Sequence, residues 1–594
     1  MGIIGWIDNA RDLRREQPVL HALADALSPT PGTYGLTRAG RHAAFARRGA
    51  STGYADWRHP EHPDPDLVLL LDGYLTNRDR LEDQLYQRPR PLTSDAEILL
   101  HAYRRWGAAL VDRVDGGFTI VIWDERARHL LLIRDPLGAR TLYYLPRPDG
   151  MLFASQATAL LAHPDVKHTV DADGLNELLA LGPVRTPGHG VIRGVQELLP
   201  GQLLRATPSG IRRHQYRTLE NSEIDTNMPG AMAFLRTTLT QKTAPLRRRP
   251  AAAVLMSGGI ASTAAALFTT SGRNGDRPTG YSLTMDSPNE LSKQTKAGLL
   301  AAAYTARRLR MKYQVASAGR DSLYAAAEAS RRAADFPGPA NLDATLFALF
   351  RHAAAQSHTS VVTGHGARAV FGGYRWLFDK ADFTRDDFPW RPRGLAPVDL
   401  LNDDTRSQLV PDAYRKLRFD DATADLPDAD AGDVIVSRRR VMARLTLTHL
   451  LPNLLVRLDR LAGAAGITVH TPFADWDLTR YLWTVPFAVR HPLGSPNGLL
   501  RAAVTGALPA MMTLLPGAPM VGAHLLPDWA QTQRDQLRGI LADPGSPLYP
   551  LLDHHRIQHL LQQPATAPVR AWHTTVAYLV EVNAWLSRHR ITPA

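Results

Sequence analysis

The stretch AAAVLMSGGIASTAAALFTT, residues 251–270, decides the fold of the C-terminal half of this chain. A short apolar run breaks at Gly258 and Gly259, and an alanine-rich helical pattern begins near Ala261. Glycines where a strand enters a helix let the backbone approach a phosphate, and the free N–H groups of the helix start favour an anion. The stretch therefore predicts a pyrophosphate cradle. An ordinary glycine turn between strand and helix is the alternative that this stretch alone leaves open.

The same pattern recurs downstream. We expect a strand at 280–284, helices around 296–309 and 342–356, and a strand at SVV that closes on Thr363, Gly364, His365 and Gly366. Strands alternating with long helices predict a doubly wound parallel sheet with ligands at the carboxyl ends of its strands. The two glycine turns should then face one crevice. A histidine such as His365 is, taken alone, more often structural than catalytic.

The N-terminal part has a different, sheet-rich pattern. LVLLLDGYL (67–75) is typical of a buried strand, and FTIVIWDERARHLLLIRDP predicts a hairpin that turns at 124–128. Ser94, with Glu97 three residues later, predicts a capping box at the start of a helix. A polar stretch at 219–229 separates the patterns. We predict an α+β domain over residues 1–220 and an α/β domain over 230–594, mostly helical from 434 to 590.

Composition excludes several classes of protein. With 594 residues, 44% hydrophobic and 21% charged, the chain has a globular composition. It has no cysteine, which rules out disulfides and thiolate sites and predicts a reducing, cytoplasmic setting. No apolar window is long enough for a membrane span. The net charge of +12 is spread in short groups such as 247–249 and 438–440, which argues against a nucleic-acid footprint. An acidic peptide or a membrane surface remains open as a partner.

Taken together, many ordered segments resemble the asparagine synthetase family, and within it the lasso-peptide macrolactam cyclases and β-lactam synthetases. The matching segments are 77–78, 111–119, 134–138, 143–144, 153–155, 185–191, 200–201, 257–259, 364–374, 457–460 and 471–473. RTPGHGV (185–191) and TGHG (363–366) favour the lasso-cyclase branch. The resemblance implies an N-terminal class II glutaminase-like sandwich and a C-terminal ATP-pyrophosphatase domain. Members adenylate a carboxylate with Mg-ATP, and an amine then attacks the acyl-adenylate.

The chain departs from the family first at its glutaminase site. Glutamine-using members carry an amino-terminal cysteine that releases ammonia, whereas this chain reads Met1, Gly2, Ile3 and has no cysteine elsewhere. Without that nucleophile we expect no glutamine hydrolysis. The missing cysteine therefore argues strongly against asparagine synthesis from glutamine as the function.

The second group of departures lies in the ATP domain. Ala261 replaces the aspartate of SGG-x-Asp-Ser, Arg368 replaces a second metal carboxylate, and Asn497 replaces a lysine that stabilises charge during amide formation. The basic residues that members carry after 508–509 appear here as Leu515, Pro516 and Gly517. Because Mg²⁺ binds through carboxylates and substrate phosphates, we predict no metal ligands and doubtful Mg²⁺ binding.

The resemblance implies two sets of site residues. The expected nucleotide-binding residues are Leu255, Ser257, Gly258, Gly259, Ser262 and Gly364. His365 and Asn497 stand at vestigial catalytic positions, together with Arg368. We expect ATP to bind weakly and without metal, through backbone N–H groups that do not depend on the lost carboxylates.

Two functions follow as hypotheses. The leading one is a lasso-cyclase-like protein with weak or absent adenylation, acting as a partner or scaffold for a precursor peptide, an active cyclase paralogue or a leader peptidase. The alternative is an active ATP-dependent macrolactam cyclase with a rearranged site, in which Arg368 grips phosphates and Asp335 or Asp459 holds a displaced metal. A role in nucleic-acid binding is a minor further possibility.

Overall fold

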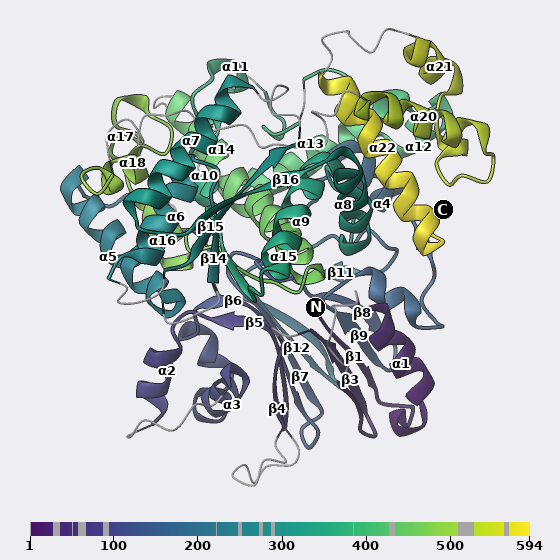
Figure 1. Cartoon of the computed structure of the whole chain (residues 1–594). Helices are drawn as coiled ribbons and strands as arrows, with labels where there is room; N and C mark the ends of the chain where they lie inside the picture. Colours follow the sequence, from purple (N-terminus) through teal and green to yellow (C-terminus); the bar gives the residue numbers. More distant parts are fainter. Residues whose placement is uncertain are drawn as a thin grey trace.

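Two antiparallel sheets of six strands form the N-terminal half of the computed structural model (Figure 1). The described residues are 2–27, 36–49, 52–56, 67–86, 94–220, 222–247, 252–272, 277–286, 292–383, 385–391, 393–426, 434–508, 528–562 and 570–594. One sheet has the order β11-β8-β9-β1-β3-β2, with β1 Gly2–Asp8, β2 Leu36–Ala39, β3 Ala43–Arg48, β8 Tyr143–Arg147, β9 Gly150–Ala154 and β11 Gln196–Glu197. The other has the order β13-β12-β7-β6-β5-β4, with β4 Thr52–Asp56, β5 Leu67–Leu75, β6 Gly116–Asp124, β7 His129–Arg134, β12 Gln202–Thr207 and β13 Gly210–Gln215.

The sheets form a sandwich because alternate side chains of each strand enter different cores. Ile3 and Phe45 from one sheet meet Val68 and Val121 from the other in the central core. The opposite face of β5 packs under α3 (Asp95–Trp106), so this strand is buried on both sides and its first five residues, 67–71, are continuously apolar. The predicted strand at 67–75 and the α+β sandwich are confirmed.

The capping box and the hairpin turn that the sequence predicts in this half are both present. The capping box at the start of α3 is present, with the Ser94 N–H donating to Glu97 (2.7 Å) and the Glu97 N–H donating to Ser94 Oγ (3.2 Å). The hairpin predicted at 124–128 joins β6 to β7. Its turn contains Arg128 at φ +50°. The first outer face is covered by α1 (Gln17–Ala26) and the second by α3 and α2 (Arg78–Leu85).

A five-stranded parallel sheet forms the centre of the second half. Its order is β16-β15-β14-β17-β18, with β14 Ala252–Leu255, β15 Thr279–Met285, β16 Tyr313–Ala318, β17 Ser360–Val362 and β18 Thr468–His470. The helices around it are α5 Met228–Arg247, α6 Ile260–Thr270, α7 Lys293–Arg308, α8 Arg320–Ala333, α9 Ala340–Ala355 and α15 Leu451–Ala464. Ala253 and Leu255 face the core under α8 and α9, whereas Val254 and Met256 face the core under α6 and α7. Helices on both faces confirm the doubly wound sheet.

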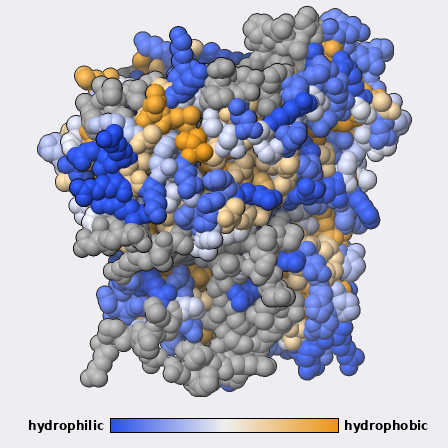
Figure 2. All heavy atoms as spheres, in the orientation of Figure 1, coloured by the Kyte–Doolittle hydropathy of each residue, from blue (hydrophilic) through white to orange (hydrophobic). Residues whose placement is uncertain are grey.

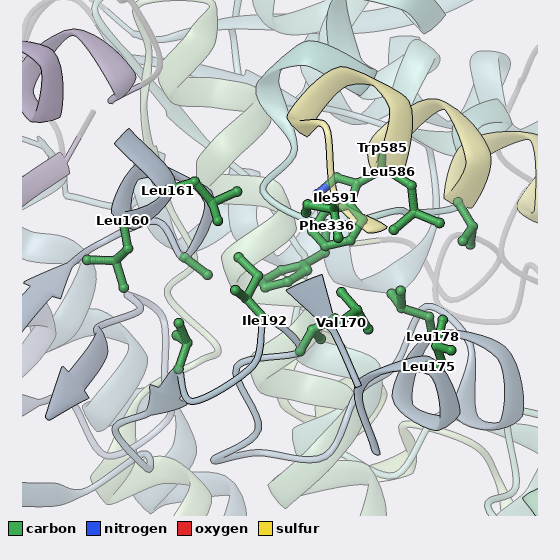
Figure 3. Packing of buried hydrophobic residues seen from close by; sticks show 14 of the residues in the cluster. Leu160, Leu161, Val170, Leu175, Leu178, Ile192, Phe336, Trp585, Leu586 and Ile591 are labelled. Carbon is green, nitrogen blue, oxygen red and sulfur yellow. The ribbon is translucent and has the colours of Figure 1, made fainter. Parts of the chain in front are cut away.

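The end of the chain returns to the N-terminal sandwich. The helix α22 (Arg570–His589) is followed by β19 (Thr592–Pro593), which pairs in parallel with β10 (Thr169–Val170). Figure 3 shows Trp585 and Leu586 of α22 beside Phe336 and facing Ile192 and Val170 of the first half. One hydrophobic core thus joins both halves. No helix in the described ranges is long and apolar enough to cross a membrane.

Candidate functional site

The two glycine turns named in the sequence analysis lie against each other. Their strands, β14 and β17, are parallel neighbours, with Val254 opposite Val362. A Cβ built on Gly364 would stand 2.6 Å from the Ala261 carbonyl carbon and 2.7 Å from the Ser262 nitrogen. Only a residue without a side chain allows this approach. The two turns therefore pack against each other at the carboxyl ends of neighbouring strands, and that they face one ligand crevice stays a prediction.

The first turn leads directly into the start of α6. Gly258 has φ +74°, and a Cβ there would lie 2.0 Å from the Gly298 carbonyl oxygen of α7. Packing alone therefore requires this glycine, whatever binds nearby. The first turn of α6 has no side-chain cap, so its N–H groups remain suited to an anion.

Two serines share a hydroxyl network under the turn. Ser262 Oγ accepts the Ser257 N–H at 3.1 Å, lies 3.2 Å from Ser257 Oγ and donates to the Gly259 carbonyl at 3.0 Å. Ser262 is buried and Ser257 is exposed. The Ser257 N–H is therefore already partnered. Leu255 packs its side chain into the core, so only its main chain could face a ligand.

His365 follows Gly364 in the second turn and is half-buried. Its Nδ1 lies 2.6 Å from Thr363 Oγ1. Burial lowers the pKa of His365 to about 4, and the positive charge of Arg457 acts in the same direction. Arg457 itself is ion-paired with Asp343. The imidazole is therefore neutral near pH 7 and can accept or donate a hydrogen bond without carrying charge.

Arg368 and Asn497 both contact the glycine pair Gly372–Gly373, which follows the second turn in the chain. Arg368 is exposed on α10 (Ala367–Val370), and its carbonyl accepts the Gly373 N–H at 2.7 Å. A Cβ on Gly373 would stand 2.3 Å from Asn497 Oδ1. Asn497 is 6% exposed, and its Oδ1 has no hydrogen-bond partner in the described part of the chain. An unpaired buried amide oxygen is costly, and here it lies beside Gly373.

Aromatic groups and a histidine complete this side of the site. Tyr374 stacks on Trp376 with ring centroids 4.3 Å apart, and burial raises the pKa of Tyr374 to about 12 against the opposing charge of Arg368. His491 packs on Gly372, where a Cβ would lie 2.6 Å from its Cε1. Burial lowers the pKa of His491 to about 4. The sequence analysis did not predict His491 at this place. Its position six residues before Asn497 is the one feature of the sequence that could have indicated it.

The residues at the turns do not suit a magnesium ion. Ala261 has no ligand atom and Arg368 is a cation, whereas Mg²⁺ requires oxygen ligands, carboxylates above all. In the part of the chain that the structure describes, no group of three or more acidic or histidine side chains could hold a metal. The uncapped start of α6, by contrast, fits a phosphate.

Two acidic residues considered as replacement ligands are engaged elsewhere. Asp335 accepts the Ala157 N–H at 2.8 Å and the Thr158 hydroxyl at 2.6 Å, so it joins the two halves of the molecule. Asp459 is ion-paired with Arg140. Both carboxylates are buried. The hypothesis of a displaced metal site at these residues therefore finds no support in the geometry. Residues 515–517 lie outside the described ranges.

A separate cleft runs between the halves. It is lined in part by the segments 111–119, 134–138 and 471–473, which carry the family resemblance, although the sequence analysis assigned no site to them. Lys242 stands in its wall, with Nζ 2.7 Å from Asp475, 3.3 Å from Asp477 and 3.5 Å from Asp115. Tyr74, Leu137, His470 and Trp476 are among its other lining residues. Asp115 comes from the N-terminal half and Asp475 and Asp477 from the start of one helix in the C-terminal half, so only the tertiary fold brings the three carboxylates to Lys242.

An antiparallel sandwich joined to a doubly wound parallel sheet, with an uncapped helix start that suits a phosphate, defines a two-domain protein with a candidate nucleotide site. Comparison with known proteins gives the family. A model of the glutamine amidotransferase domain matches residues 1–217, and the model of asparagine synthase matches residues 235–587. The chain belongs to the asparagine synthase family, whose members are ATP-dependent.

Two asparagine synthetases match most of the chain. Asparagine synthetase [glutamine-hydrolyzing] 3 of Bacillus subtilis is 27% identical over 622 aligned residues, which cover 99% of each chain. The putative asparagine synthetase of Mycobacterium bovis is 25% identical, covering 84% of this chain and 82% of its own. A solved glutamine phosphoribosylpyrophosphate amidotransferase from B. subtilis is 14% identical, and the match covers 53% of this chain and 65% of that one with a TM-score of 0.26.

Proposed function

We propose that this chain is an asparagine synthetase-family protein whose own carboxylate adenylation is weak or absent. We further propose that it acts as a partner or scaffold in peptide modification of the lasso-cyclase type. The observation that carries the proposal is the chemistry at the two adjoining turns, where Ala261 and Arg368 stand in place of the family's carboxylates. Asn497, in place of a lysine, adds a third loss on the same side.

The expected loss of rate is large. Removing one preorganised electrostatic group typically costs about 2.7–4 kcal/mol of transition-state stabilisation, or roughly 10²–10³ in rate. Three such losses leave little turnover, even though effects within one site do not add. The apolar strands, the glycine turns and the interface between the halves are all retained. Retained folding residues beside lost chemical ones support a binding role.

Nucleotide binding is expected to survive in a weakened, magnesium-insensitive form. The N–H groups at the start of α6 do not depend on the lost carboxylates, and Arg368 adds positive charge near the turns. Calorimetry with ATP, with and without Mg²⁺, tests this. We expect similar weak affinity in both conditions. Arg368→Ala should weaken ATP binding more than Arg193→Ala, which removes an exposed arginine of the N-terminal half. Strict dependence on Mg²⁺ would contradict the proposal.

The test of lost chemistry is restoration. We expect negligible ATP–pyrophosphate exchange by the wild-type protein with candidate carboxylate substrates. A variant combining Ala261→Asp, Arg368→Asp and Asn497→Lys should gain exchange activity by at least tenfold. Arg193→Asp with Ala127→Asp, which changes surface charge equally in the sandwich, is the control for the two acidic changes. Robust wild-type exchange that the triple change abolishes would instead favour an active macrolactam cyclase with a rearranged site.

The partner follows from the family branch that RTPGHGV and TGHG suggest in the sequence. A precursor peptide, an active cyclase paralogue or a leader peptidase is the expected partner. Co-expression with such proteins and measurement of complex formation by size-exclusion chromatography would test this part. If none of the three proteins co-elutes with this chain at micromolar concentration, the result would count against this part of the proposal.

A further inference from the structure

The outward face of α7 combines positive charge with exposed apolar side chains. Lys293, Lys296, Leu300, Tyr304 and Arg307 recur at intervals of three or four residues, so they lie on one side of the helix. Leu300 is 73% exposed and Tyr304 is 46% exposed. Figure 2 shows hydrophobic side chains at the surface over the region that Figure 1 labels α7. The opposite face of the helix is buried on the sheet.

Among the described residues, no acidic side chain compensates the charge on this face of α7. α7 contains no aspartate or glutamate. Lys293, Lys296 and Arg307 form no ion pair with any carboxylate in the described ranges. Arg308, Arg310 and Lys312 are also exposed and extend the positive charge beyond the helix. Such a face attracts an anionic partner and offers it an apolar contact in the middle.

An exposed sheet edge lies beside the helix. β16 is the terminal strand of the parallel sheet and pairs with β15 alone in the described part of the chain. The Tyr313 hydroxyl donates to the Leu299 carbonyl at 3.5 Å and thereby connects β16 to α7. Val315, two residues further on, points to the same side of the sheet and is 44% exposed. No described residue pairs with the outer main-chain groups of this strand, which is the arrangement that an added strand requires.

We infer that α7 and β16 form a docking surface for an extended, acidic segment of a partner protein. The segment pairs with the edge of β16, places an apolar side chain on Leu300 and Tyr304, and directs carboxylates at Lys296 and Arg307. The inference specifies where the partner of the proposed function binds, and it rests on that proposal only for the partner's biological role. The surface itself is independent of nucleotide chemistry.

Other occupants fit this surface less well. A second copy would bring one basic face against another, since the whole chain carries a net charge of +12. A membrane-binding helix presents a broad apolar face, whereas α7 exposes two large apolar side chains and buries its remaining apolar side. A sheet edge offers main-chain hydrogen bonds to an extended peptide, and a lipid cannot pair with it in this way.

Fluorescence anisotropy of a labelled synthetic peptide tests the inference. The peptide has twelve residues, with Leu and Val at its centre and Asp and Glu on both sides, and binding is measured at 150 mM salt without nucleotide. We expect micromolar binding that weakens at least tenfold in Lys296→Glu with Arg307→Glu and at least threefold in Leu300→Ser. Arg205→Glu with Arg212→Glu makes the same charge change beside another sheet edge, β13, and should change affinity by less than twofold.

Several results would overturn the inference. One is the absence of peptide binding, and another is equal weakening by the β13 control pair. Tighter binding to phosphatidylserine vesicles or duplex DNA than to the peptide, lost in the Lys296 and Arg307 variant, would assign the surface to a different partner. Dimerisation lost in Leu300→Ser would assign it to a second copy. Because no nucleotide is present, none of these outcomes bears on the exchange assay that tests adenylation.

Discussion

Replacing Gly364 by alanine tests directly whether the two glycine turns form one site. The new methyl group would lie 2.6–2.8 Å from the main chain of Ala261 and Ser262. Real Cβ atoms do not approach backbone so closely, and backbone cannot move aside as a flexible side chain can. Overpacking of this kind costs about 1–3 kcal/mol. We expect the change to push the start of α6 away from β17.

Thermal unfolding measures the cost, and nucleotide titration measures the effect on the site. At about 2.1 cal/mol/K of unfolding entropy per residue, a unit the size of the C-terminal half loses roughly 1.3 °C per kcal/mol, so its unfolding transition should fall by about 1–4 °C. ATP binding should weaken at least fivefold, because the N–H groups of the α6 start lose their alignment with the second turn.

Gly539→Ala is the matched control. Gly539 lies within α20 (Trp529–Ala542), and a Cβ there meets nothing within 4 Å. Alanine is favoured over glycine in a helix by about 1 kcal/mol, so this variant should be as stable as the wild type or more so. If Gly364→Ala matched it in stability and in ATP affinity, the contact between the turns would have no part in the site.

Three further predictions concern the interface and the buried histidines. Asp335→Ala removes the acceptor for the Ala157 N–H and the Thr158 hydroxyl, and should cost about 1–2 kcal/mol; an unchanged melting temperature would contradict this role. Trp585→Ala should cost about 3–5 kcal/mol and make α22 sensitive to trypsin, and equal resistance to digestion would refute its anchoring role. Burial lowers the pKa of His449 to about 4, so folding stability should decline as pH falls from about 6.5 towards 4. His449→Gln should flatten that decline in urea titrations, and an identical slope would exclude this histidine as a source.

Sequence patterns predicted elements well where local chemistry was strong. The capping box at Ser94, the buried strand at 67–75 and the hairpin turn at 124–128 all follow from short-range rules. The strand β16 and the helix α8 were missed. The buried residues of α8 do recur at helical spacing (Leu323, Ala326, Ala327, Ser330 and Ala333), but all except Leu323 are small, so they mark the apolar face of the helix only weakly. The three-residue strand β18 also escaped notice within a segment that is otherwise helical.

The sequence by itself determined which chemical groups this protein does not have. The absence of cysteine and the residues Ala261, Arg368 and Asn497 are facts of composition and motif, and no fold can restore a missing carboxylate or thiol. Tertiary structure alone decided which residues meet. Gly364 touches Ala261, Asn497 lies on Gly373, and Asp335 and Asp459 are held in contacts between the halves. Such contacts join residues up to hundreds of positions apart, and their distances depend on how strands and helices pack rather than on any local pattern.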